Sequence, residues 1–132
     1  MAFLELDNLR KEFGDLVAVD GVSLTVEEGQ FVTIVGPSGC GKSTILRSIT
    51  GLETPTSGEI RLEGKDITEL PPYRRNIGLV FQDYALFPHK TVFENVAFGL
   101  KMRGAPEGEQ RERVSEMLEM VNLEGYEEKY PG

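Results

Sequence analysis

A glycine-rich segment in the first half of the chain has the residue types needed to hold phosphate groups. The run Gly36-Pro37-Ser38-Gly39-Cys40-Gly41-Lys42-Ser43-Thr44 fits a pattern of Gly, four residues, Gly-Lys, then Ser or Thr. Glycines let the backbone curl so that its amides point inward at phosphate oxygens. Lys42 is spaced to reach the β- and γ-phosphates, and the Ser43 hydroxyl to ligate a magnesium ion that bridges them. We predict a nucleotide site whose phosphate contacts are Ser38, Gly39, Cys40, Gly41, Lys42, Ser43 and Thr44.

The residues on either side of this loop predict the elements that must position it. The run 31–35, Phe-Val-Thr-Ile-Val, is nearly continuously apolar and β-branched, which is typical of a central strand covered on both faces. After the loop, Ile45, Leu46 and Ile49 follow helical spacing, and Gly51 is a plausible helix stop. The helix amino terminus would add partial positive charge to the phosphate site. Because a strand and a helix flank the loop, a chance match in a glycine-rich turn is the less favoured interpretation.

Cys40 is the single cysteine of the chain, so it excludes an internal disulfide and fits a reducing compartment. The helix terminus and Lys42 could activate its thiol. An inert small residue that fills the loop is the favoured interpretation.

On both sides of the glycine loop and its flanking elements, alternating patterns indicate strands joined by tight turns. The ranges 3–9 and 18–26 predict an antiparallel layer, 59–63 a short strand, and 76–81 an apolar strand that ends at Gln82. Farther along, Thr91 and Glu94 form a capping box that opens a helix. The apolar stripe of this helix consists of Val92, Phe93, Val96, Ala97 and Leu100. A second helix is predicted over about 109–121, and its apolar stripe consists of Val114, Met117, Leu118 and Val121.

Composition limits the classes of partner and compartment. With 132 residues and 39% hydrophobic content, one globular domain is expected. No run is long enough to cross a bilayer, and the amino terminus lacks the features of a signal peptide, so we expect a cytoplasmic protein. A formal net charge of −8 argues against a nucleic-acid or anionic-lipid surface. The range 105–132 has eight Glu against Arg111, Arg113 and Lys129, which is typical of a solvated helix face.

Several runs together resemble one family along the whole chain. The glycine loop 36–44 closely resembles the Walker A loop of ATP-binding cassette (ABC) proteins, and the run 80–89, Val-Phe-Gln-Asp-Tyr-Ala-Leu-Phe-Pro-His, resembles their Q-loop. The runs 71–78 (Pro-Pro-Tyr-Arg-Arg-Asn-Ile-Gly) and 94–100 (Glu-Asn-Val-Ala-Phe-Gly-Leu) are similar to importer ATPases serving sugars, polyamines, ferric iron or sulfate.

The resemblance implies roles that spacing alone does not assign. Phe13 matches the aromatic residue that stacks on adenine, although from sequence alone core packing would be favoured. Gln82 matches the glutamine that touches magnesium and the attacking water, so the expected catalytic residues are Lys42 and Gln82 and the metal ligands Ser43 and Gln82; the alternative for Gln82 is an amide that caps a turn. In the family the surface from 82 to 100 forms part of the cleft for a coupling helix of the transmembrane subunit. Residues Tyr84, Leu86 and Phe87 would line it, or else form core under a loop.

His89 also lies in this region, and we assign it no chemistry. It is not the family's switch histidine, which lies much later.

The expected fold class is therefore α/β, a P-loop NTPase core with an amino-terminal antiparallel β layer and the start of a helical subdomain. We expect the β layer over 1–30, the core over 31–90 and the helical part over 91–132. The sequence contains no Leu-Ser-Gly-Gly-Gln signature and no Walker B aspartate with its catalytic glutamate, which predicts a fragment truncated before both. The resemblance implies that the Walker B strand would lie beside 31–35, so its absence would leave an apolar edge unpaired and prone to association.

Two kinds of function follow. The first is the ATPase subunit of an importer, which binds ATP with Mg²⁺ and works with transmembrane permease subunits and a second ATPase subunit, as a homodimer on the cytoplasmic side of the membrane; this chain alone would bind with little hydrolysis. The second is a non-catalytic nucleotide-binding module. A soluble cassette in translation or DNA repair and an exporter are disfavoured, and the transported substrate cannot be identified from these residues.

Overall fold

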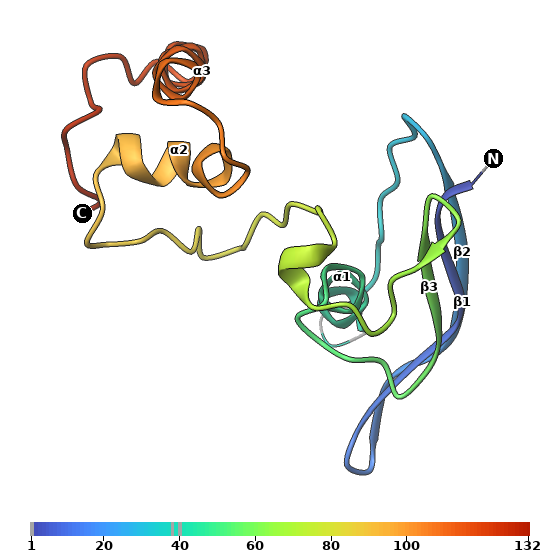
Figure 1. The fold of residues 1–132 in the computed structure, drawn as a ribbon. Coiled ribbons are helices and arrows are strands. Elements are labelled where there is room, and N and C mark those ends of the chain that lie inside the picture. Colours follow the sequence, from blue (N-terminus) through green and yellow to red (C-terminus); the bar gives the residue numbers. More distant parts are fainter. Residues whose placement is uncertain (1, 38, 40) are drawn as a thin grey trace. The chain divides into compact units, whose positions relative to one another are not determined.

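The computed structural model describes residues 2–37, 39 and 41–132 (Figure 1). The predictions for Ser38 and Cys40 fall outside the described residues. The chain forms two compact units, Met1–Leu79 and Val80–Gly132, and each is described by itself.

The first unit is built on an antiparallel sheet. A long hairpin of β1 (Ala2–Phe13) and β2 (Leu16–Glu27) is followed later in the chain by β3 (Ser57–Leu62) and the short β4 (Lys65–Asp66). The strand order is β2-β1-β3-β4 with every pair antiparallel. This confirms the predicted antiparallel layer and the short strand near 59–63, with longer strands than the alternation alone indicated.

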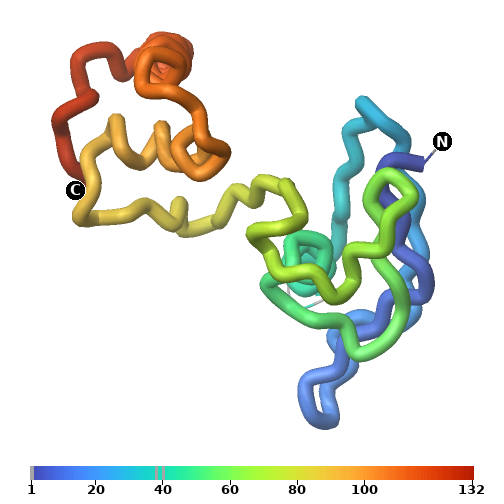
Figure 2. Tube along the Cα trace, in the orientation of Figure 1, coloured from blue at the N-terminus to red at the C-terminus, as the bar shows by residue number. Residues whose placement is uncertain are grey.

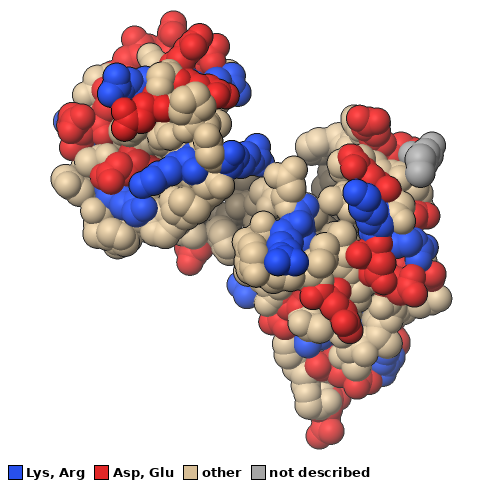
Figure 3. All heavy atoms as spheres, in the orientation of Figure 1, with Lys and Arg blue, Asp and Glu red and all other residues tan. Residues whose placement is uncertain are grey.

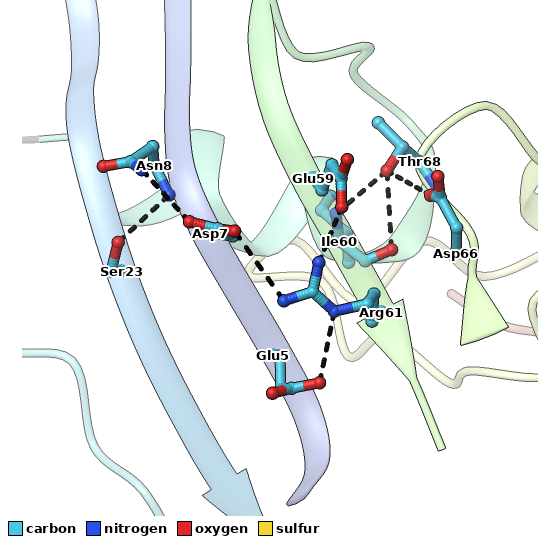
Figure 4. Close-up of polar contacts among 9 residues, drawn as sticks. All are labelled: Glu5, Asp7, Asn8, Ser23, Glu59, Ile60, Arg61, Asp66 and Thr68. Carbon is cyan, nitrogen blue, oxygen red and sulfur yellow. Dashed lines mark hydrogen bonds and ion pairs between the residues drawn. The ribbon is translucent and has the colours of Figure 1, made fainter. Parts of the chain in front are cut away.

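Charged side chains help to fix the register of β1 against β3, as Figure 4 shows. The Arg61 guanidinium on β3 donates to Glu5 at 3.2 Å and to Glu59 at 2.6 Å, and lies 3.7 Å from Asp7. These groups raise the pKa of Arg61, chiefly through the hydrogen bond to Glu5. Exposed ion pairs add little stability. Cross-strand pairs of opposite charge nevertheless disfavour a shifted register.

Helix α1 (Lys42–Thr50) covers this sheet and closes its core. Ile45 is buried and Ile49 is half-buried, so the predicted apolar face is confirmed for these two residues, whereas Leu46 is 45% exposed. Gly51 ends the helix in the left-handed conformation, with φ 90°, and its amide bonds to the Arg47 carbonyl. The buried core of the unit consists of Leu6, Leu9, Val19, Ile45, Ile60 and Ile67.

Two predicted strands are absent from the described part of the chain. The segment 31–35 runs from the end of β2 toward α1 as coil (Figure 2), with Phe31 92% and Val35 86% exposed. The segment 76–81 is also coil. Both predictions were wrong because strand propensity describes how well a side chain fits a sheet, while strand hydrogen bonds come from neighbouring strands. Ile34 and Ile77 still pack against the core from these segments.

The second unit contains two helices, α2 (Val92–Met102) and α3 (Glu107–Met120). The capping box is confirmed: the Glu94 amide donates to the Thr91 hydroxyl at 3.1 Å, and the Thr91 amide donates to the Glu94 carboxylate at 3.0 Å. Ala97 of α2 and Val114 and Leu118 of α3 form the buried core, with Val92 and Phe93 packed against it.

Four residues of the predicted helix stripes lie outside this core: Val96, Leu100, Met117 and Val121. Val96 is 38% exposed and Val121 is 58% exposed. Together with Met117, they line an apolar cavity of about 390 Å³ between the helices. A two-helix unit has too few elements to surround both sides of each helix, which leaves part of each stripe uncovered.

Both acidic and basic side chains are spread over the face drawn in Figure 3. None of the helices that the structure describes is both long and apolar enough to cross a bilayer.

Candidate nucleotide-binding site

The glycine loop leads into α1 with the backbone conformations that its sequence requires. Gly39 and Gly41 have φ values of 80° and 95°, a region that residues with side chains rarely adopt. A Cβ atom added to Gly41 would lie 2.3 Å from the carbonyl oxygen of Ala18 on β2. The loop therefore approaches the sheet more closely than any side chain at position 41 would permit.

Helix α1 begins directly after this close approach, and its first intrahelical bond runs from the Ile45 amide to the Gly41 carbonyl at 3.0 Å. The N-cap residue, Gly41, makes no side-chain capping hydrogen bond. The first amides of an α-helix have no partner within the helix and concentrate partial positive charge at its terminus. An anion is the natural partner for these donors.

Lys42 and Ser43 occupy the first turn of α1. The Lys42 ammonium group folds back over the loop, donating to the Gly36 carbonyl and, at 3.2 Å, to the Pro37 carbonyl. The Ser43 hydroxyl is on an exposed residue, and Thr44 is half-buried. A cation held across the loop and a hydroxyl beside it are the groups that a nucleotide phosphate and its magnesium ion require.

The residues present thus fit a bound Mg-nucleotide in their chemistry: glycines where a Cβ would clash, an amide-rich helix terminus, a lysine and a hydroxyl. The described residues contain no group of three or more His, Cys, Asp or Glu that could hold a metal ion by itself. A magnesium ion bound by phosphate oxygens and one hydroxyl needs no such group.

Phe13, the predicted adenine-stacking residue, lies in the same unit at the end of β1. Its side chain is 42% exposed, so the alternative of core packing does not describe it well. The Lys11 ammonium group lies 5.0 Å from the centre of its ring. Phe13 therefore has an exposed ring with the Lys11 ammonium group beside it, in the unit that contains Lys42.

Arg75 holds the far end of α1, a role that the sequence patterns did not indicate. It is only 3% exposed, and its guanidinium donates to the carbonyls of Ser48 at 2.7 Å and Ile49 at 3.0 Å in the last turn of the helix. It also donates to the carbonyls of Leu70 at 2.8 Å and Thr68 at 3.0 Å. Burial lowers the pKa of Arg75, which stays protonated at neutral pH. A cation at a helix carboxyl terminus complements the helix dipole.

Gln82 belongs to the second unit, where it is exposed in the coil that precedes α2. The backbone just after it is unusual, because Tyr84 and Ala85 both have positive φ values, 67° and 49°. Strained residues of this kind concentrate at ligand clamps and switch regions. The pairing of Gln82 with Ser43 and Lys42 stays a prediction.

The other residues of this loop divide into exposed and packed ones. Tyr84 is 81% and Leu86 55% exposed, whereas Phe87 is half-buried with its ring centre 4.8 Å from that of Phe98. Asn95, another residue missed from the sequence, ties the loop to α2: its amide oxygen accepts from the Phe87 amide at 2.9 Å, and its amino group donates to the Phe87 carbonyl at 3.1 Å. An asparagine in a helix gives no spacing signal for such a role.

Comparison with known proteins places these features in a family. A model of the family described as ABC transporter matches residues 19–132. The Fe(3+) ions import ATP-binding protein FbpC of Escherichia coli K12 is 51% identical over 128 residues, which are 97% of this chain and 37% of that protein. The spermidine/putrescine import ATP-binding protein PotA of Rubrobacter xylanophilus is 52% identical over 97% of this chain and 34% of its own length. The chain thus spans little more than a third of these relatives.

Solved structures agree with this assignment. The ATP-binding cassette MJ0796, solved as a dimer in a post-hydrolysis state with ADP and Pi, matches with a TM-score of 0.84 and 37% identity over 97% of this chain and 61% of its own. MJ1267, an ATP-binding cassette of an ABC transporter, matches with a TM-score of 0.80 and 32% identity over 98% of this chain and 58% of its own. With its glycine loop at the start of α1 and with these likenesses in sequence and fold, the chain belongs to the ABC transporter family, in its ATP-binding part.

Proposed function

We propose that this chain binds Mg-ATP, and that the complete protein is the ATPase subunit of an importer that couples ATP binding and hydrolysis to solute transport. The observation that best supports nucleotide binding is the start of α1. There Gly41 lies where a Cβ would meet the Ala18 carbonyl, and Lys42 and Ser43 follow in the first helical turn. Import is supported by the names of the relatives, which are import ATP-binding proteins for Fe(3+) ions and for spermidine and putrescine.

Each predicted site residue has a role in this proposal. The amides from 38 to 44 and the Lys42 ammonium group hold the phosphates, Ser43 and Gln82 hold the magnesium ion, and Phe13 stacks on the adenine ring. The bound magnesium supplies positive charge to the β- and γ-phosphates. The division into a β layer over 1–30, a core over 31–90 and a helical part over 91–132 belongs to the same proposal.

The partners proposed for the complete protein are transmembrane permease subunits, contacted through the exposed Tyr84 and Leu86, and a second ATPase subunit in a homodimer. Dimeric assembly is supported by the ATP-binding cassette MJ0796, whose structure with ADP and Pi is a dimer. The protein would lie on the cytoplasmic side of the membrane as a peripheral subunit.

The experiment compares the purified chain with its Lys42→Ala variant. ATP binding is measured by isothermal titration calorimetry with and without Mg²⁺, and phosphate release in a steady-state assay. We expect Mg-dependent ATP binding that Lys42→Ala weakens by a factor of 10 or more, because about 1.4 kcal/mol of charge–phosphate attraction corresponds to tenfold. This chain alone is expected to release little phosphate, and robust Lys42-dependent turnover by it would contradict that expectation. Absence of phosphate release by the complete protein would favour the alternative, a non-catalytic module. ATP binding that is equal in the variant would refute the proposed site.

A further inference from the structure

Lys11 makes three contacts that together link Phe13 to the segment behind α1. Its ammonium group donates to the Thr54 carbonyl at 2.7 Å, lies 3.6 Å from the Glu53 carboxylate, and lies 5.0 Å from the centre of the Phe13 ring. The Lys11 side chain is only 17% exposed, which is unusual for a lysine. A lysine in this position is held in place rather than free in solvent.

The strand geometry explains why Lys11 and Phe13 meet. Both are on β1, two residues apart, so their side chains leave the same face of the strand. Glu12 between them points elsewhere, since its carboxylate accepts from Arg10 at 2.6 Å. Phe13 pairs with Leu16 across the turn that closes the β1–β2 hairpin.

The segment that holds Lys11 is itself fastened to both β1 and α1. The Glu53 amide bonds to the Arg47 carbonyl in the last turn of α1 at 3.1 Å, and the Thr56 amide bonds to the Arg10 carbonyl on β1 at 2.7 Å. These two backbone hydrogen bonds, one on each side of Thr54, hold the Thr54 carbonyl oxygen in place as an acceptor. Lys11 therefore contacts the exposed Phe13 ring while its ammonium group is hydrogen-bonded to the fixed carbonyl of Thr54.

We propose that Lys11 is a positioning residue for nucleobase binding: it holds one face of the Phe13 ring, which leaves the ring oriented for a purine base to stack on it. This inference rests on the proposed function, because it assigns Phe13 to the base. A cation over one face of an aromatic ring is attracted by the ring's electrons and restricts the side chain's rotation. A ring restricted before binding loses less entropy when the base stacks on it.

The expected magnitudes separate this role from phosphate binding. Stacking of a base on an aromatic side chain contributes enough that Phe13→Ala should weaken ATP binding by about 5- to 150-fold. A cation–π contact at a partly exposed site corresponds to about 2- to 5-fold, which is the effect expected for Lys11→Met. Inorganic tripolyphosphate has the charge of the ATP phosphate chain and no base, so its affinity should change by less than about 1.5-fold in either variant.

The test measures ATP and tripolyphosphate binding, each with Mg²⁺, by calorimetry on the full chain and on five variants. These are Lys11→Met, Lys11→Arg, Phe13→Ala, the double variant Lys11→Met/Phe13→Ala, and Lys65→Met, which removes one charge from an exposed lysine of β4 and should leave both affinities unchanged. Lys11→Arg keeps the positive charge, so its affinity for ATP should be close to that of the unchanged chain. The double variant should bind ATP no more weakly than Phe13→Ala alone, because Lys11 acts through the ring. Circular dichroism confirms that each variant is folded.

Three outcomes would overturn the inference. Equal weakening of ATP and tripolyphosphate by Lys11→Met would mean that Lys11 acts through α1 or through charge. Full additivity in the double variant would mean that Lys11 does not act through Phe13, and no effect on ATP would remove the role altogether. Failure of the proposed function is distinguishable, because neither ligand would then bind to the unchanged chain in a manner that Lys42→Ala weakens.

Discussion

Replacing Arg75 tests how α1 is held against the rest of the first unit. The guanidinium makes four hydrogen bonds to carbonyl oxygens at 2.7 to 3.0 Å, and hydrogen bonds to a charged group contribute roughly 1.5–3 kcal/mol each. Against this gross gain stands the desolvation of a buried cation, on the order of several kcal/mol. Arg75→Ala removes both terms and leaves buried acceptors without donors. We expect a net loss of about 3–5 kcal/mol, as for breaking other buried charged networks.

A loss of this size is a large fraction of the stability available. At roughly 0.05–0.15 kcal/mol per residue, the unit Met1–Leu79 has a free energy of unfolding of about 4–12 kcal/mol. The assay is urea unfolding at 25 °C followed by circular dichroism. With a slope of about 1–3 kcal/mol per molar urea, the midpoint should fall by more than about 1 M, or the unit should already be unfolded without urea.

The neighbouring arginine gives a matched control. Arg74 is exposed, and its guanidinium lies 5.9 Å from the centre of the Tyr73 ring, so Arg74→Ala should change stability by less than about 0.5 kcal/mol. Arg75→Lys keeps the charge but loses the planar fork that reaches several carbonyls at once, and it should be intermediate. The reasoning is refuted if Arg75→Ala and Arg74→Ala unfold at the same urea concentration.

The remaining predictions concern the loop, the helix cap and the uncovered apolar segment. We expect Gly41→Ala to weaken ATP binding by about tenfold or more in calorimetry, because the new Cβ would lie 2.3 Å from a carbonyl oxygen of β2; Gly29→Ala, also at positive φ but in open space, should leave affinity unchanged. The backbone hydrogen bond from Thr91 lowers the pKa of Glu94, so its stabilisation of α2 is present above the ordinary Glu pKa of about 4.3 and is lost as pH falls through the lower folded value. As the pH is lowered through this range, the melting temperature of Glu94→Gln should therefore fall less than that of the unchanged chain. Equal decreases in melting temperature would contradict the role of the Glu94 carboxylate. Phe31 is 92% exposed, so we expect the chain to bind a hydrophobic dye and to associate with rising concentration in sedimentation, and Phe31→Ser to reduce both; equal dye binding and association in the variant would exclude this segment as their cause.

Features of the fold that depend on a few adjacent residues could be predicted from the sequence. The capping box needs only Thr91 and Glu94, and the end of α1 needs only a glycine able to adopt positive φ at position 51. The β1–β2 hairpin likewise follows from alternation around a turn at Gly14, whose φ is 59°. In each case the stabilising partner lies within the same element or its neighbour.

Features that depend on distant partners could not be predicted in this way. The run 31–35 has the composition of a buried strand, but a strand forms only where another strand supplies its hydrogen bonds. Arg75 shows the converse: its carbonyl partner Ser48 lies 27 positions earlier in the chain, and no pattern of residue types specifies that bond. For the proposed site, the sequence predicted Lys42 and Ser43 by their spacing, whereas the contacts that hold α1 could be found only in the structure.

The contacts that hold α1 explain how the proposed phosphate site can be ordered beside residues 31–35, which form no strand. At its amino end the helix is located by the close approach of Gly41 to β2, and at its carboxyl end by Gly51 and the guanidinium of Arg75. Between them Ile45 is buried in the core of the sheet. None of these contacts involves residues 31–35 except through the half-buried Ile34. The position of Lys42 and Ser43 is therefore determined mainly by the antiparallel sheet and by the chain around Arg75, and nucleotide affinity should depend on these contacts more than on strand pairing at 31–35.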